Sequence, residues 1–300
     1  MIAQGKKASA IDYAAESHFV SVKGSNMHYY DLGSGDPILF LHGIPTNAYL
    51  WRHIIPALSA QARCIAPDLI GMGQSDKPDI AYRIFDHIAY LDEFIDALKL
   101  KNITLVLHGW GSVAGFDYAR RHEKNIKAIA FYESHVQPVT DWSQLSLPVQ
   151  QFATLLSRPG ASYRAIIKQN YFIEKLLPRS AIQGLSPEVM THYRTPFLTP
   201  ESRKPLWQYL NDLPLGKGPA DVVQLMQSYS DWLQKTKIPK LMLYAIPGFM
   251  TPMETVRWSR DHLPHIQLAA LDDALHLAQE SVPDQFSEAL LQWYQTLSSS

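Results

Sequence analysis

The stretch Leu107-His108-Gly109-Trp110-Gly111-Ser112 decides the fold of this chain. The apolar run 103–107 leading into it is typical of a buried strand, and a helical pattern begins with Val113-Ala114-Gly115-Phe116 directly after it. A strand that enters a helix through small residues has the geometry of a nucleophile elbow, in which one side chain stands on a strained turn and the next N–H faces an oxyanion. The exposed position of this elbow is Gly109, which has no side chain to present.

Short apolar runs alternate with helical patterns on both sides of the elbow. Such alternation predicts an α/β fold, with a mostly parallel sheet of eight strands flanked by helices. The clearest helix covers about residues 83–98, because Ile84, Ile88, Leu91 and Ile95 recur at steps of three and four. The expected strands are 38–41, 64–66, 103–107, 126–132, 240–245 and 266–271, preceded by a hairpin of 19–23 and 27–31 around a turn at 24–26.

The alternation lapses in one long segment of the chain. Residues 138–215 carry helical patterns rich in aromatics and prolines, and strands resume at Lys240. We therefore expect residues 1–137 and 216–300 to form one core, with 138–215 inserted as a helical cap. The Gly/Pro-rich loop 214–219 is expected to return the chain to the core.

Composition narrows the class of partner. The 27 Lys and Arg nearly balance the 28 Asp and Glu, and no basic run with interleaved aromatics indicates nucleic acid. The single cysteine, Cys64, rules out a disulfide framework and a cysteine-rich metal site. No apolar run reaches the roughly eighteen residues that a membrane span requires. We expect a cytoplasmic protein that binds small molecules, and the sequence does not indicate its oligomeric state.

Ligands of an open parallel sheet bind beyond the carboxyl ends of its strands, so the residues that follow each strand are the candidates for a site. The turn His42-Gly43-Ile44-Pro45 follows one expected strand, and its N–H groups would face a developing negative charge, although a tight turn alone also requires glycine. Glu133 follows the expected strand 126–132. It would serve either as a catalytic acid or as a surface ion-pair partner. His276 follows the last strand, where an ordinary surface or capping histidine is the alternative.

Taken together, these motifs resemble the haloalkane dehalogenases and the Renilla luciferase related to them. The resemblance covers nearly the whole chain and is carried by His42-Gly43-Ile44-Pro45-Thr46, by Pro67-Asp68-Leu69-Ile70-Gly71-Met72-Gly73-Gln74-Ser75-Asp76-Lys77-Pro78, and by the elbow itself. Asn170-Tyr171-Phe172-Ile173-Glu174 is similar to the family's cap. The resemblance implies an α/β-hydrolase fold with a helical cap.

The matching motifs imply that His276 is the catalytic base of this chain and that Glu133 is the acid. The alternative acid position in 243–248 contains no carboxylate. Asp272 and Asp273 are closer to His276 in sequence, but we expect them to cap or solvate the turn before it.

The resemblance also assigns a halide site, and this chain departs from it. Trp110 matches the tryptophan whose indole N–H binds the halide, and its backbone N–H would belong to the oxyanion hole. Ile44 stands where the family has an asparagine as second halide donor, so halide binding should be weaker. Gly109 stands where the family has its aspartate nucleophile, so ordinary covalent dehalogenation is not expected.

Three functions remain open. In the first, His276 held by Glu133 acts as a general base on water or on a small apolar substrate without covalent catalysis. In the second, the chain is a dehalogenase whose nucleophile was lost or replaced by design. In the third it binds a small ligand without turnover, and a luciferase-like monooxygenase is a minor fourth option. No cofactor and no metal are expected.

A pocket for such a molecule would be lined by aromatic side chains of the cap. We expect Phe172, Trp142 and Phe152 to line it, with Tyr171 and Trp207 as further candidates, although core packing would explain some of these residues equally well.

Overall fold

An eight-stranded sheet forms the centre of the computed structural model, which describes residues 16–139, 150, 154, 159–214, 218–246 and 248–297. Its strand order is β1-β2-β4-β3-β5-β6-β7-β8. The first two strands pair antiparallel with their neighbours and the others run parallel. The strands are β1 (Ser17–Val22), β2 (Ser25–Leu32), β3 (Pro37–Leu41), β4 (Arg63–Pro67), β5 (Ile103–Gly109), β6 (Ile126–Ser134), β7 (Lys240–Ala245) and β8 (Ile266–Leu271). All eight expected strands are confirmed.

The first hairpin turns one residue earlier than expected. Lys23 and Gly24 have φ angles of 51° and 76°, and Val22 pairs with Ser25. Two central residues with positive φ are typical of a type I′ turn, whose twist matches that of the flanking strands. Ser25 and Asn26, which we expected in the turn, therefore begin β2.

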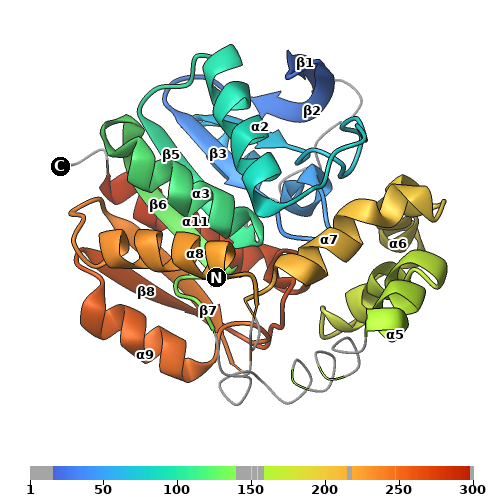
Figure 1. Ribbon diagram of the computed structural model, residues 1–300. Coiled ribbons are helices and arrows are strands. Elements are labelled where there is room, and N and C mark those ends of the chain that lie inside the picture. The colour runs from blue at the N-terminus through green and yellow to red at the C-terminus, as the bar shows by residue number, and fades with distance from the viewer. Residues whose placement is uncertain are drawn as a thin grey trace, which may run out of the picture.

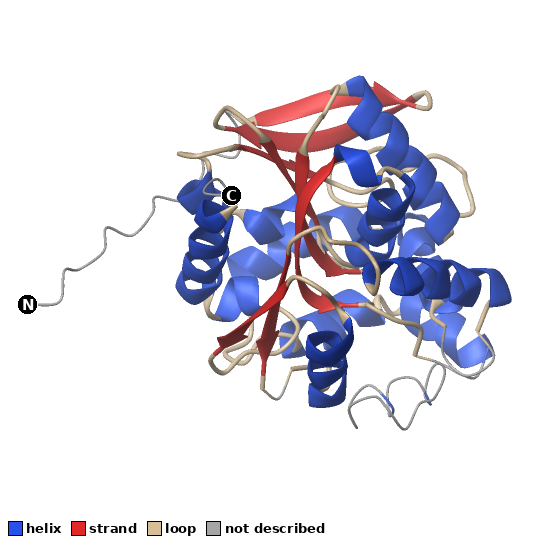
Figure 2. Cartoon of the chain, turned by 90° about the vertical axis from the view of Figure 1, so that its left-hand side faces the viewer, coloured by secondary structure: helices blue, strands red, loops and turns tan. Residues whose placement is uncertain are grey.

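Helices cover both faces of the sheet, as the edge-on view in Figure 2 shows. On one face α2 (Ile84–Ala97), α3 (Gly111–Arg121) and α8 (Ala220–Leu233) lie side by side, and α11 (Pro283–Thr296) lies behind the sheet in Figure 1. The short α1 (Ile55–Leu58) and α10 (Ala278–Ser281) contact α11, whereas α9 (Met253–His262) packs on β8.

The expected helix at 83–98 is confirmed, and this range corresponds to α2 together with its two capping residues. Arg83 and Leu98 flank α2, and the Asp86 carboxylate accepts the N–H of Arg83 at 2.9 Å. Ile84, Ile88, Leu91 and Ile95 form the buried face of α2.

Between β6 and α8 the described chain contains only helices, which Figure 1 shows apart from those on the sheet. They are α5 (Pro159–Tyr163), the π-helices Arg164–Lys168 and Phe172–Leu176, α6 (Pro187–Arg194), α7 (Lys204–Asp212) and the short 3-10 turns Leu177–Arg179, Thr195–Phe197 and Glu201–Arg203. Further 3-10 turns in the core are Ala48–Trp51 and Glu123–Asn125. No helix of the described residues is long and apolar enough to cross a membrane.

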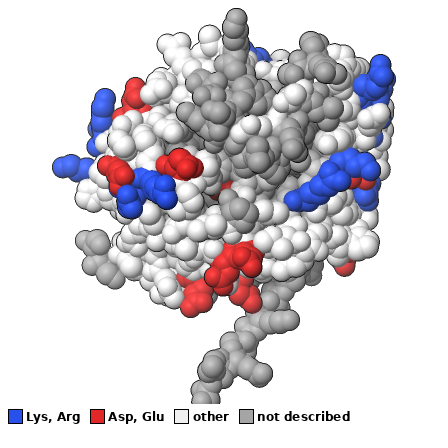
Figure 3. Space-filling model, turned by 90° about the horizontal axis from the view of Figure 1, so that it is seen from below, with Lys and Arg blue, Asp and Glu red and all other residues white. Residues whose placement is uncertain are grey.

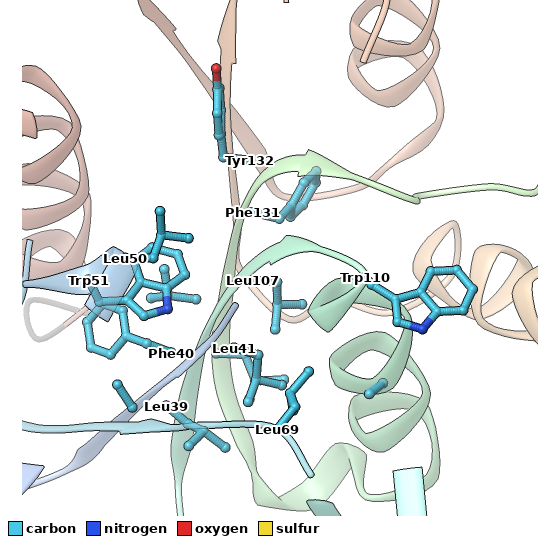
Figure 4. Packing of buried hydrophobic residues seen from close by; sticks show 14 of the residues in the cluster. Leu39, Phe40, Leu41, Leu50, Trp51, Leu69, Leu107, Trp110, Phe131 and Tyr132 are labelled. Atoms are coloured by element: carbon cyan, nitrogen blue, oxygen red, sulfur yellow. The ribbon is translucent and has the colours of Figure 1, made fainter. Parts of the chain in front are cut away.

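The core fills the space between the sheet and its helices. Leu39, Phe40, Leu41 and Leu107 are fully buried on the two central strands. Figure 4 shows Trp51 beside Phe40, with ring centroids 5.3 Å apart. The surface is mixed, because the face in Figure 3 carries small separate groups of both charge signs among its described residues.

A buried ion pair of the core accepts a hydrogen bond from the helical segment 159–214. Arg52 follows the 3-10 turn Ala48–Trp51 and donates twice to Glu280 of α10, with both N–O distances 2.5 Å. Their side chains are 6% and 5% exposed. Tyr193 of α6 donates its hydroxyl to the same carboxylate at 2.8 Å. This cluster fixes α6 against the core.

We expect Glu280→Ala to lower the free energy of unfolding by about 3–5 kcal/mol, because it leaves the Arg52 guanidinium buried without its charge partner. Chemical denaturation measures this loss. The matched control is Glu93→Ala, which breaks the exposed pair with Lys23 and should cost no more than about 1 kcal/mol. Equal losses for the two variants would contradict this account of the cluster.

Candidate active site

The turn between β5 and α3 brings two backbone segments unusually close together. A Cβ on Gly111 would lie 2.4 Å from the carbonyl oxygen of His42 and 2.8 Å from that of Leu41. A Cβ on Gly43 would lie 3.2 Å from the Cα of Gly109. Only glycine permits this approach, which places the turn after β3 directly against the elbow.

Gly109 has the backbone conformation of an elbow residue, with φ at 50°. A Cβ built there would lie 3.6 Å from both Cε1 and Nε2 of His276, which is ordinary van der Waals contact. A side chain at position 109 would therefore point at the imidazole of His276.

Glu133 and His276 form a hydrogen-bonded dyad across the ends of the strands. The Oε2 atom of Glu133 lies 3.0 Å from Nδ1 of His276, and these side chains are 1% and 13% exposed. Glu133 has φ of 48° at the end of β6, and its carboxylate also accepts the backbone N–H groups of Phe249, Met250 and Thr251 at 3.0, 2.6 and 3.2 Å.

The charge of Glu133 is stabilised despite its burial. Burial by itself would raise the pKa of this carboxyl, but the hydrogen bond from His276 and those from the N–H groups of Phe249 and Met250 outweigh burial and lower the pKa. Glu133 is therefore an ionised acceptor that orients Nδ1–H of His276 and leaves Nε2 free to accept a proton.

Two further side chains fix the backbone that carries His276, and the sequence reading missed them. His108 lies 2.8 Å through Nε2 from the carbonyl oxygen of His276. Burial lowers the pKa of His108 well below its usual value, so the neutral ring donates Nε2–H to that carbonyl. Tyr132 donates its hydroxyl to the carbonyl of Leu275. Their places in the sequence, directly before Gly109 and Glu133, are the signal that could have identified them.

Trp110 lies at the start of α3 and projects away from the core around Trp51, as Figure 4 shows. Its indole is 1% exposed and packs edgewise against His135 and Tyr209, with centroid distances of 5.5 and 5.1 Å. Ile44 is 5% exposed. No turn, loop or cap hydrogen bond of the described chain uses the backbone N–H of Ile44 or of Trp110, so both remain available to an oxyanion.

The pocket residues expected from the cap are only partly described. Phe172 is buried, and its ring lies 5.8 Å from that of Tyr209, which connects it to Trp110. Trp142 and Phe152 lie outside the described residues. Trp207 contacts Tyr163 at 5.6 Å. Tyr209, two residues further along α7, is the aromatic residue that touches Trp110, and the sequence reading did not select it.

The two aspartates near His276 are not part of the dyad. Asp272 accepts a hydrogen bond from the side-chain amide of Gln285 at 2.7 Å and donates its N–H to the amide oxygen at 3.0 Å, so it closes the turn before His276. Asp273 is exposed. Within the described ranges, no group of three or more His, Cys, Asp and Glu side chains is arranged to hold a metal ion.

The chain is similar to known proteins over almost its whole length. Residues 36–283 match the family model of the alpha/beta hydrolase fold. A haloalkane dehalogenase from Sphingobium indicum is 38% identical over 284 residues, which cover 92% of this chain and 94% of that protein. One from Mesorhizobium japonicum is 36% identical over 277 residues, covering 91% and 89%. The crystal structure of the haloalkane dehalogenase DatA from Agrobacterium tumefaciens C58 is similar with a TM-score of 0.89 at 36% identity, covering 94% of this chain and 96% of that one.

The lowered pKa of Glu133 makes its contribution to stability depend on pH. We expect Glu133→Gln to lower the free energy of unfolding at pH 7 by about 1–3 kcal/mol, because an amide accepts the surrounding N–H groups less strongly. The difference from the unmodified protein should shrink as pH falls through the ordinary carboxyl range toward the lower folded pKa, since the carboxylate is then protonated.

Urea denaturation between pH 7 and pH 3 measures this difference. Asp273→Asn is the matched control, because Asp273 lies three residues from His276 but is exposed. A difference for Glu133→Gln that stayed constant across this range would contradict the ionised state of Glu133.

Proposed function

Because the chain belongs to the haloalkane dehalogenase family of α/β hydrolases, we propose that it is an enzyme of this family that works without a covalent intermediate. The family resemblance puts an aspartate nucleophile where this chain has Gly109. Glycine has no atom that can attack a substrate, so the covalent route is closed. The proposed catalytic residues are His276 as general base and Glu133 as the acid that orients it.

The single observation that carries the proposal is the geometry of the dyad. Glu133 lies 3.0 Å from His276, and Nε2 of the same ring lies 3.6 Å from the position of a Cβ on Gly109. A binding protein has no need of a buried carboxylate and imidazole held together in this way. The pair supports a base that takes a proton from a water or a substrate beside Gly109.

The proposed chemistry is hydrolysis by direct attack of water. His276 takes a proton from water at Nε2, and the oxygen of the resulting hydroxide forms a bond to an electrophilic carbon of the substrate. Glu133 stabilises the imidazolium that forms. For an ester, this addition moves the carbonyl π electron pair onto the carbonyl oxygen, whose negative charge the N–H groups of Ile44 and Trp110 stabilise. The carbonyl then re-forms as the bond from its carbon to the alcohol oxygen breaks, and the imidazolium gives its proton to that leaving oxygen.

Space for the attacking water is available because residue 109 is glycine. The Cβ direction of Gly109 points at the His276 ring from 3.6 Å, and the carboxyl group of an aspartate would occupy the region beyond it. A water there would lie beside Nε2, where the base can reach it.

The substrate that we propose is a small apolar organic molecule held under a helical cap formed by residues 138–215. The half-buried Tyr209, which packs on Trp110, and the buried Phe172, which packs on Tyr209, support an apolar pocket. The near-neutral charge and the single cysteine, which is buried, fit a cytoplasmic enzyme.

Isotope labelling tests the direct attack of water. A panel of small esters, epoxides and haloalkanes identifies a hydrolysed substrate, which is then converted in a single turnover in ¹⁸O-water with enzyme in excess. We expect the product of the first turnover to carry ¹⁸O and the protein mass to stay unchanged. An unlabelled first product with ¹⁸O retained in the protein would show a covalent ester and refute the proposal.

Removal of the base provides an independent check. His276→Ala should lower kcat for the same substrate by at least about 100-fold, in the range of general-base catalysis. His53→Ala is the control, because it removes a half-buried histidine outside the dyad. An unchanged kcat in His276→Ala would exclude the proposed base.

A second candidate function is a haloalkane dehalogenase that has lost its nucleophile. Two features favour it: Trp110 is retained, and a side chain at position 109 would point at His276. We expect no halide release by the chain as it stands, and measurable release by Gly109→Asp, or by Gly109→Asp with Ile44→Asn, from chlorinated and brominated alkanes. Folded double variants that release no halide from any of these alkanes would count against this candidate.

A further inference from the structure

A serine, a histidine and an aspartate form a hydrogen-bonded row outside the site at Gly109. Ser17 Oγ lies 2.8 Å from Nε2 of His28, and Nδ1 of the same ring lies 2.8 Å from Oδ2 of Asp68. These residues belong to β1, to β2 and to the loop after β4, at the β1 edge of the sheet (Figure 1). Glu133 and His276 belong to β6 and to the segment after β8, so the row is separate from that dyad.

The Asp68 carboxylate is held as a hydrogen-bond acceptor for the ring of His28. Besides the ring, it accepts the backbone N–H groups of Ala48 and Gln74, both at 2.7 Å. Burial by itself would raise the pKa of this carboxyl, but the hydrogen bonds from His28 and from the Ala48 N–H outweigh burial and lower the pKa. An ionised carboxylate only accepts hydrogen bonds, so in the neutral ring the proton is on Nδ1. Nε2 therefore accepts the hydroxyl proton of Ser17.

The backbone around the row fixes the ring and the carboxylate relative to each other. Ser75 Oγ accepts the N–H of His28 at 3.0 Å and donates to the carbonyl of Asp68 at 2.7 Å. The N–H of Asp68 donates to the carbonyl of His28 at 2.9 Å. The side-chain amide of Gln74 makes a second, longer contact of 3.3 Å with Nε2. The nearer partner of the accepting nitrogen is the hydroxyl of Ser17.

Only the serine end of the row is open to solvent. The side chains of His28 and Asp68 are 0% and 3% exposed, whereas Ser17 is half-buried. Phe19, two residues further along β1, lies on the same face of the strand as Ser17. Its ring lies 5.2 Å from that of His28 and the residue is 55% exposed. The base and the acid are thus shielded, while the hydroxyl can be reached beside an exposed apolar side chain.

We propose that Ser17 is a nucleophile of a second site, with His28 as its base and Asp68 as a positioning residue, and that this site takes acyl groups from small apolar esters. A hydroxyl within hydrogen-bond reach of a base that a third group orients is the arrangement that activates a serine. The apolar part of the ester would pack on Phe19. The inference does not rest on the proposed function, because none of these residues belongs to the site at Gly109.

The proposed step transfers the acyl group to the serine. Ser17 Oγ forms a bond to the carbonyl carbon of the ester as its proton passes to Nε2 of His28, and the carbonyl π electron pair moves onto the carbonyl oxygen. The carbonyl re-forms as the bond from its carbon to the alcohol oxygen breaks, and the imidazolium gives its proton to that oxygen. The products are an ester of Ser17 and a free alcohol.

Covalent labelling with an alkyl fluorophosphonate tests the inference. The activated hydroxyl forms a bond to phosphorus as the bond to fluorine breaks and fluoride leaves. We expect a single adduct, located on Ser17 by peptide mass spectrometry and absent in Ser17→Ala. Ser21 is the internal comparison, because it is exposed on the same strand and pairs with Asn26. Exposure alone would label Ser21 as well, and we expect it to stay unlabelled.

Replacement of the base tests the role of the row. His28→Gln should slow labelling of Ser17 by at least about 100-fold, because an amide can accept the hydroxyl hydrogen bond but cannot take the proton. The matched control is His18→Gln, which changes the exposed neighbouring histidine of β1 and should leave the rate unchanged. Asp68→Asn replaces His28→Gln if the latter does not fold. It should also slow labelling, because its amide can donate to Nδ1 and favours the ring with the proton on Nε2.

Three results would overturn the inference: no adduct on Ser17, labelling of Ser21 as fast as that of Ser17, or an unchanged labelling rate in a folded His28→Gln variant. In each case the row would serve only to hold β1 on β2. Because the readout is an adduct on Ser17 and not hydrolysis, this outcome is independent of the activity measured for His276→Ala.

Discussion

The close approach of two backbone turns is the constraint on which the site depends. Gly111 lies so near the carbonyl groups of Leu41 and His42 that no Cβ fits between them, and a Cβ on Gly43 would lie 3.2 Å from the Cα of Gly109. Once β3 and β5 pair in parallel, this contact fixes where the N–H groups of Ile44 and Trp110 lie. The direction in which residue 109 faces follows from the same packing. The placement of these two N–H groups, which we propose as the oxyanion site, is therefore set by the backbone and does not depend on a side chain at position 109.

The dyad is held by a separate set of interactions. Glu133 is kept ionised by His276 and by three consecutive N–H groups of residues 249–251. His108 and Tyr132 hold the carbonyl groups of the segment that carries His276. None of these contacts involves the side-chain position at 109. The hydrogen bond between Glu133 and His276 therefore does not depend on which residue occupies position 109.

The sequence predicted those features that depend on local patterns. Apolar runs located all eight strands, and the spacing of Ile84, Ile88, Leu91 and Ile95 located α2. The family motifs brought Glu133 and His276 together, although 143 positions separate them. Contacts between distant segments were not predictable in this way. No pattern in the sequence assigns a partner to His108 or places Tyr209 on Trp110, because those contacts arise only when β5, β6 and α7 are packed. The short hairpin turn was misplaced because positive φ at Lys23 has no sequence signal comparable to glycine.

Gly109 and Glu133 occupy the ends of adjacent strands with nearly the same left-handed backbone, at φ of 50° and 48°. For glycine this conformation carries no steric penalty, whereas for glutamate it costs on the order of 1 kcal/mol or more. The two positions therefore differ in backbone strain. Gly109 is free of it, whereas Glu133 bears it with a large charged side chain. Selection for stability alone would relax both positions, so the strain that persists at Glu133 argues that the carboxylate still serves a purpose in this chain.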